Sequence, residues 1–274
     1  IMEYLIQLWY KKNSKQFIME TFAPVVNGSG FLSTLFYLCE KGELIWLKPL
    51  LEDLEHKNPG DQDKYTLLHA AADHGQLNVA EYLIPLLDDK NPKAGPRKYD
   101  TSIIHDGMTP MHLAARKGHL SIIAYMVQHL NGDINPADCN GCTVLHEAAY
   151  FGHLKLVAFF TEKLDNPNPE EISKDKFRGR TPLHYAAQQG HFEVVKHLCD
   201  LLQDKNPSDD HGDTPLHCAA YNGHIDIVEY LVPFLENKHS LAVSITWLMR
   251  IFSTPLGETR RKRRAEVVNF LQNL

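Results

Sequence analysis

The feature that most constrains this chain is a ten-residue pattern that occurs five times within its 274 residues. Each copy begins with Thr, has His at its fourth position and Gly at its tenth, and carries an Ala pair between them. Successive copies lie 43, 34, 38 and 33 residues apart and start at Thr66, Thr109, Thr143, Thr181 and Thr214. A repeat of about 33 residues with two insertions predicts a stack of small units rather than one globular core.

Each copy is predicted to form a short helix, a turn and a second helix. The leading Thr is a favoured N-cap, and in three copies Pro follows at the first helical position. The Gly is expected to end the first helix in a left-handed conformation. Apolar residues then recur at helical spacing, as in Ile225, Ile227, Val228 and Leu231. Two such helices cannot bury their apolar faces alone, so neighbouring units must pack together.

Five in-register copies of Thr-Pro-Leu-His-x-Ala-Ala, with Gly three residues on, resemble the ankyrin repeat. The resemblance covers roughly residues 30–235. It implies an all-α ankyrin repeat solenoid of about six to seven helix-turn-helix repeats with short hairpin-like connections. Residues 33–42 are interpreted as a divergent N-terminal copy. We expect an N-terminal extension over 1–29, a repeat domain over 30–238 and a degenerate or disrupted C-terminal repeat over 239–274.

The repeat also explains why histidine is abundant, with 16 residues in the chain. The resemblance implies that the histidines of the Thr-Pro-Leu-His motif are hydrogen-bonded within and between repeats. It implies that those after the turn Gly hold the turn between the two helices. The first set is His69, His112, His146, His184 and His217, and the second set is His119, His153, His191 and His224.

The connections between repeats carry two further expectations. Asn58, Asn135 and Asn206 each lie eight residues before a repeat Thr. By the resemblance they are candidates for asparaginyl hydroxylation, although the preference of Asn for turn geometry explains them without any enzyme and a Pro follows each one. The connection from Asp88 to Gly107 contains the larger insertion and is expected to project from the stack.

Charge and composition exclude several classes of function. The formal net charge is −6, and without the cations at 260–264 the rest of the chain carries −11. Such an acidic body does not match a phosphate backbone, so we expect no nucleic-acid partner. The longest apolar run near the C-terminus, 241–252, is too short to span a membrane, so we expect no membrane partner. Five scattered cysteines indicate a reducing, intracellular compartment, and we expect the cytoplasm, with the nucleus as the alternative.

No pattern of residues predicts chemistry. The chain lacks a Walker-type phosphate loop, a His-Glu-x-x-His helix and a Gly-x-Ser-x-Gly elbow. Cys139 and Cys142 with His146 supply fewer ligands than a structural zinc site needs. We therefore predict no catalytic residue, no metal, no cofactor and no small-molecule substrate.

The resemblance implies a non-enzymatic protein-protein interaction scaffold, an adaptor or inhibitor, that acts as a monomer. It implies that another protein binds along the concave surface, on the hairpin residue before each Thr and the exposed face of the first helices. Arg and aromatic side chains are enriched at the energetic centres of interfaces. The candidate binding residues are Tyr65, Met108, Arg116, Lys117, Tyr150, Phe151, Arg178, Arg180, Tyr185, Gln188 and Tyr221. Their cations suggest a partner segment with acidic and apolar residues.

Two alternatives stay open. The chain could be a regulatory ankyrin segment of a larger enzyme or channel, and its true start could be Met2, Met19 or a residue upstream. The basic run near the C-terminus could be a nuclear-import signal or a solvated face of the last repeat. That run consists of Arg260, Arg261, Lys262, Arg263 and Arg264.

Overall fold

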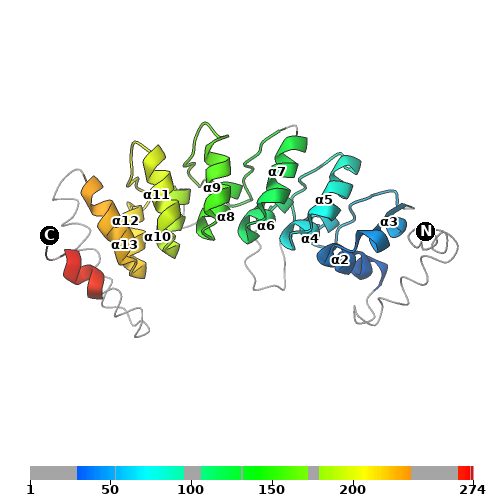
Figure 1. The fold of residues 1–274 in the computed structure, drawn as a ribbon, viewed down its shortest axis with the longest axis horizontal. Helices are drawn as coiled ribbons and strands as arrows, with labels where there is room; N and C mark the ends of the chain where they lie inside the picture. Colours follow the sequence, from blue (N-terminus) through cyan, green and yellow to red (C-terminus); the bar gives the residue numbers. More distant parts are fainter. Residues whose placement is uncertain are drawn as a thin grey trace, which may run out of the picture. The chain divides into compact units, whose positions relative to one another are not determined.

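The computed structural model describes residues 30–52, 54–95, 106–130, 132–171, 179–235, 265–271 and 273. In these ranges the chain forms paired helices. Apart from single antiparallel bridges at Gly60–Thr66 and Ala137–Thr143, the same ranges contain no strand. The chain divides into two compact units between Ile134 and Asn135. The predicted all-α class is confirmed, and six helix pairs are present in the described part (Figure 1).

The first unit contains three helix pairs, in which the first helices α2, α4 and α6 pack side by side. Their partners α5 and α7 also contact each other, and α3 packs on α2. The helices are α2 (Phe31–Lys41), α3 (Leu44–Glu52), α4 (Leu67–Asp73), α5 (Leu77–Leu83), the 3-10 helix η1 (Ile84–Leu86), α6 (Pro110–Lys117) and α7 (Leu120–His129).

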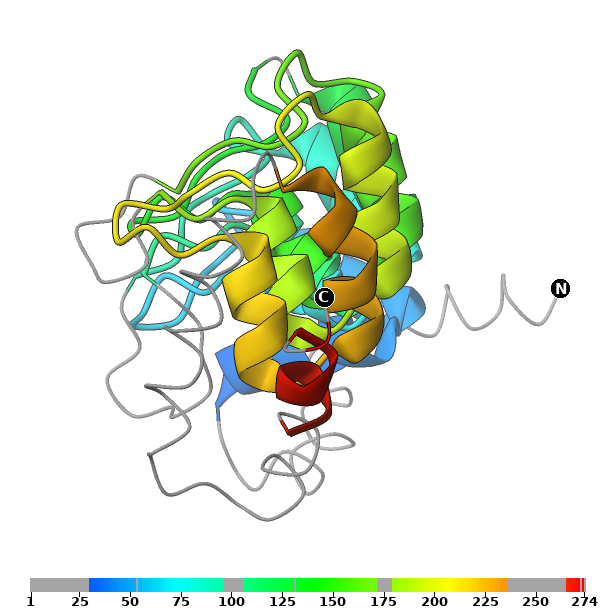
Figure 2. The same cartoon turned by 90° about the vertical axis from the view of Figure 1, so that its left-hand side faces the viewer.

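The second unit repeats this arrangement. Helices α8, α10 and α12 form one layer, α9, α11 and α13 form another, and the connections leave on one side as hairpins (Figure 2). The elements are α8 (Val144–Tyr150), α9 (Leu154–Thr161), α10 (Pro182–Gln189), α11 (Phe192–Leu201), α12 (Pro215–Asn222), α13 (Ile225–Leu231) and the 3-10 helix η2 (Val232–Phe234).

The two end copies differ from the repeat, as the sequence suggests. Helix α2 starts at Phe31, before the motif position, and its N-cap Gly30 offers no side chain. It still ends at a left-handed Gly42 with φ 71°. At the other end, residues 265–271 are helical and bury Val267 and Leu271. Because residues 236–264 lie outside the described ranges, the boundaries assigned to the C-terminal copy stay a prediction.

A reciprocal pair of hydrogen bonds starts the first helix of each clear copy. The Thr hydroxyl accepts from the backbone N–H of the His, and the His ring accepts from the backbone N–H of the Thr. The arrangement is a capping box in which His takes the place of Glu. In the third of the five clear copies, for example, Thr143 N lies 3.1 Å from His146 Nδ1. The cap predicted from Thr is therefore confirmed, and His completes it.

The other nitrogen of these histidines links one repeat to the next. Because Nδ1 accepts a hydrogen bond, it carries no proton, so Nε2 of the neutral ring carries the proton and donates a hydrogen bond. His69 Nε2 lies 3.2 Å from Met108 O, His146 Nε2 lies 3.1 Å from Arg180 O, and His184 Nε2 lies 3.1 Å from Asp213 O. The implied bonding within and between repeats is confirmed for these three buried histidines.

The histidines after the turn hold the turn of the preceding repeat. His191 Nε2 lies 2.9 Å from Tyr150 O, and His224 Nε2 lies 3.1 Å from Gln188 O. Each ring lies over the turn Gly of that repeat, where a Cβ on Gly190 would come within 2.5 Å of His224. The five turn glycines all have φ between 73° and 82°, which confirms the left-handed turn.

The asparagines of the connections have a specific role that sequence reasoning missed. The side-chain oxygen of Asn206 accepts from the backbone N–H of Leu216, in the first turn of α12, at 3.1 Å. Asn58, Asn91, Asn135 and Asn168 make the same bond to the helices that follow them, at 2.9, 3.2, 2.9 and 3.1 Å. Among the described residues, Lys64 is the one non-glycine with positive φ, so a left-handed geometry does not explain these asparagines.

Replacing Asn206 with Ala should lower the free energy of unfolding by about 1 kcal/mol, because the Leu216 N–H loses its acceptor. Asn206→Asp keeps an oxygen at the same place and should recover most of this loss. Urea unfolding of both variants measures the difference. Equal losses in the two variants would show that the side-chain oxygen is not what stabilises the helix start.

The longest connection is closed at its base. Ala94 N donates to Met108 O at 2.8 Å, and Gly107 N donates to Ala94 O at 2.9 Å. The inserted residues 96–105 lie outside the described ranges, so their projection from the stack stays a prediction.

Candidate protein-binding face

The second unit brings several of the predicted binding residues to one face. We call the exposed side of α8, α10 and α12, with the hairpin residues 206–213, the inner face. The predicted residues on this face are Tyr150, Phe151, Tyr185, Gln188 and Tyr221. Phe151 directly follows α8 and is 39% exposed, and the other four side chains are partly exposed.

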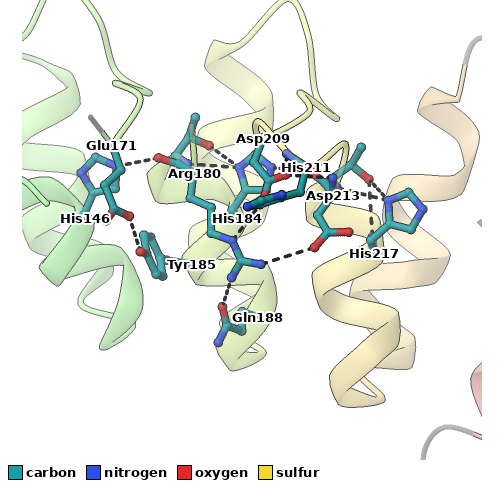
Figure 3. A network of polar contacts seen from close by, with 12 residues as sticks. His146, Glu171, Arg180, His184, Tyr185, Gln188, Asp209, His211, Asp213 and His217 are labelled. Atoms are coloured by element: carbon teal, nitrogen blue, oxygen red, sulfur yellow. Dashed lines mark hydrogen bonds and ion pairs between the residues drawn. The ribbon is translucent and has the colours of Figure 1, made fainter. Parts of the chain in front are cut away.

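Three aromatic rings on the inner face are linked through Tyr150, which contacts the other two. The ring centres of Tyr150 and Phe151 are 4.9 Å apart, and those of Tyr150 and Tyr185 are 5.8 Å apart. The hydroxyl of Tyr185 donates to the buried carboxylate of Glu171 (Figure 3). Burial and this carboxylate raise the pKa of Tyr185. The three rings thus form a fixed aromatic group that spans two neighbouring repeats.

Arg180 does not have the exposed position that we predicted for it. It is buried, and its guanidinium lies between its own helix and the next hairpin (Figure 3). Nε donates to Asp209 at 3.2 Å, Nη1 donates to Gln188 at 2.7 Å, and Nη2 lies 3.6 Å from Asp213. The prediction of an exposed hairpin tip is therefore wrong for Arg180. Its guanidinium joins two repeats.

The hairpin after α11 is acidic. Asp209 is buried, and its Oδ1 accepts from the backbone N–H groups of His211 and Asp213 at 2.9 Å each. Asp210 beside it is exposed. The Asp213 side chain is 25% exposed, and burial together with the nearby Asp209 charge raises its pKa. The Arg180 guanidinium therefore faces two carboxylates, Asp209 and Asp213.

Sequence reasoning did not identify this charge network, although a signal for it exists. Arg180 and Asp213 occupy the same position of successive repeats, one residue before the Thr. Opposite charges one repeat apart at such a position indicate a contact between neighbouring hairpins. Asp209 likewise stands five residues before Thr214, as Asp61 and Asp138 do before their own Thr.

In the first unit, the predicted hairpin residues are buried. Met108 is 0% exposed and Tyr65 is 7% exposed. The Tyr65 ring stacks on His69 with 5.2 Å between ring centres and also contacts Phe36. The predicted exposure of Tyr65 and Met108 is therefore wrong, because both side chains turn towards the repeat interior.

The remaining cations divide between two situations. Arg116 is partly exposed, and Lys117 is exposed and lies 3.9 Å from Asp73. Arg178 and the basic run at 260–264 lie outside the described residues, so their predicted roles are untested.

The described residues contain neither a cluster of metal ligands nor a helix that could span a membrane. No group of three or more His, Cys, Asp or Glu in the described ranges could hold a metal ion. Cys142 Sγ lies 3.8 Å from Glu147 Oε1. No helix in the same ranges is long and apolar enough to cross a membrane.

Comparison with known families agrees with the fold. The model of the family described as ankyrin repeats in three copies matches residues 86–171 and 160–241, and that of the single ankyrin repeat matches residues 63–92. Together these matches cover more than half of the chain. The chain belongs to the ankyrin repeat family, whose repeats imply protein–protein interaction.

Two curated relatives are similar to part of the chain. Palmitoyltransferase AKR1 of Lachancea kluyveri is 31% identical over 114 residues, which are 40% of this chain and 14% of that protein. Transient receptor potential cation channel subfamily A member 1 of Homo sapiens is 30% identical over 107 residues, 39% of this chain and 9% of that protein. The matched regions are thus small parts of two much longer proteins.

Proposed function

We propose that this chain is a non-enzymatic binding module, an adaptor or inhibitor, that holds a partner protein against the inner face. Membership of the ankyrin repeat family supports a protein partner. The joined rings of Tyr150, Phe151 and Tyr185 support this face, because aromatic side chains often dominate binding energy. The scattered cysteines of the chain favour a reducing compartment, so we propose that the protein acts in the cytoplasm.

The observation that carries this proposal is the exposure of Phe151. In the other clear copies, the residue before the turn Gly is polar: His74, Lys117, Gln189 and Asn222. Here it is a phenylalanine with 39% of its surface exposed, held beside the ring of Tyr150. An aromatic side chain that departs from the pattern of its repeat, on an exposed face, favours a role in binding.

Replacing Phe151 with Ser should weaken partner binding about tenfold or more, because an interface aromatic is removed. Folding should be nearly unchanged, since the side chain is exposed. The partner recovered with each variant from native cells would be quantified by mass spectrometry, with thermal unfolding measured in parallel. Leu201→Ser removes another exposed apolar side chain, 50% exposed on α11, and should leave recovery unchanged.

Equal losses for Phe151→Ser and Leu201→Ser would place the binding surface elsewhere. If Phe151→Ser unfolds the protein instead, the ring belongs to the core and the proposed face is wrong.

A second candidate is a regulatory ankyrin segment within a larger enzyme or channel. It is favoured by the two relatives, of which the chain matches only 14% and 9%. In this case the ankyrin segment would bind and regulate, while other parts would carry the activity. The length of the native polypeptide decides between the candidates. A native polypeptide far longer than 274 residues would favour the second candidate, a regulatory segment of a larger protein.

A further inference from the structure

We propose that the inner face selects a partner segment that carries an Arg or Lys side chain beside an apolar one. The basic side chain would lie against Asp213 and the tyrosine rings, and the apolar one would lie against Phe151. This inference rests on the proposed function and specifies its partner.

The first step concerns Arg180, one of the cations predicted from the sequence to bind an acidic partner segment. The Arg180 guanidinium is buried and engaged by Asp209 and Gln188, with Asp213 at 3.6 Å. Extracting this guanidinium for a partner would leave the buried Asp209 carboxylate without it, which is costly. Arg180 is therefore not the group that recognises a partner.

The second step is the balance of charge over the described part of the inner face. Helix α8 contains Glu147, and α10 and α12 contain no Asp, Glu, Lys or Arg. The hairpin 206–213 adds Asp209, Asp210 and Asp213. Arg180, which precedes α10, is the cation that contacts Asp209 and Asp213, so two carboxylates face one guanidinium. Complementary charge on a partner is then positive.

The third step locates where a partner cation would lie. The Asp213 side chain is 25% exposed, and its Oδ2 is 3.6 Å from Arg180 Nη2, longer than the 3.2 Å contact to Asp209. Its pKa is raised by burial and by the Asp209 charge. A second cation at the exposed side of Asp213 would offset both effects. Asp213 is thus the carboxylate best placed to receive one.

The fourth step connects this carboxylate to the aromatic rings. Helix α10 carries Gln188, which binds Arg180, and also Tyr185, whose ring is 5.8 Å from that of Tyr150. The acidic hairpin and the aromatic group therefore adjoin the same helix (Figure 3). Long basic side chains bind such a combination well, because the stem packs on an aromatic ring while the charged end reaches a carboxylate.

The test is a selection of random twelve-residue peptides that bind the immobilised full chain. Selected peptides are then synthesised, and their dissociation constants are measured for the parent chain, Phe151→Ser, Asp213→Asn and the control Leu201→Ser. Thermal unfolding confirms that each variant is folded. Asp213→Asn is a mild change because its amide oxygen can still accept from Arg180.

We expect the selected peptides to combine Arg or Lys with apolar residues. These peptides should bind the Phe151→Ser variant more weakly than the parent chain. Asp213→Asn should weaken them about fivefold, with no change for Leu201→Ser. Raising the salt concentration should weaken binding to the parent more than binding to Asp213→Asn.

Two results would overturn the inference in distinguishable ways. Peptides that need Phe151 but are rich in Asp or Glu, or are indifferent to Asp213→Asn, would refute the basic partner and leave the inner face as the binding site. A selection without binders sensitive to Phe151→Ser would refute both proposals.

Discussion

Gly190→Val should lower the free energy of unfolding by about 3–5 kcal/mol, the largest effect of any single change considered for this fold. Gly190 has φ 82°, where a β-branched residue is strained. A Cβ there would also lie 2.5 Å from the His224 ring. That ring is fixed by its bond to Gln188 O at 3.1 Å, so it cannot easily move aside.

Gly212→Val provides the matched control. Gly212 has nearly the same φ, 81°, but a Cβ on it would meet nothing within 4 Å. Its loss should be limited to backbone strain, about 1–2 kcal/mol. Denaturant unfolding of both variants separates strain from packing. Equal losses would show that the His224 ring yields, and an unchanged Gly190→Val would refute the left-handed turn.

Stability should also fall as the pH decreases from about 6.5 towards 4. Burial lowers the pKa of His146 and of His184 to about 4, from an ordinary value of 6.5. Between these values the unfolded chain binds protons that the folded chain excludes, so unfolding becomes more favourable. The stabilisation is complete above pH 6.5 and is lost as the pH falls through 4. Each histidine contributes on the order of 3 kcal/mol to this change.

His184→Leu separates this effect from the titration of carboxylates. The variant should be less stable at pH 7.5, because Thr181 N–H and Asp213 O lose their ring partner. Its free energy of unfolding should depend less on pH between 6.5 and 4, because one proton-binding group is gone. Urea unfolding at several pH values measures both effects. A pH dependence equal to that of the parent would contradict the assignment to His184.

Most of the repeat could be predicted because the residues that define its helices and turns act on near neighbours in the sequence. The Thr N-cap, the His three residues later and the turn Gly act within one helix and its ends. Even the bond from His184 to Asp213 O follows from the regular spacing of the copies. The asparagine caps were missed, because insertions place Asn91 and Asn168 at different distances from their Thr.

The candidate site was predicted only in part. Tyr150, Phe151, Tyr185, Gln188 and Tyr221 do lie on one face of the second unit. Their binding role itself stays a prediction. The burial of Arg180 was not predicted, since the sequence shows this cation but not that Asp209 and Asp213 face it.

The sequence by itself determined the class of this protein and the positions of the caps and turns in its clear copies, because these depend on neighbours within one repeat. Only the tertiary structure decided which of the residues before the Thr are buried. Met108 is buried and Arg180 meets Asp209, 29 residues away, whereas Asp213 stays 25% exposed. Exposure and charge compensation are set by packing between repeats, where side chains distant in sequence displace water and pair.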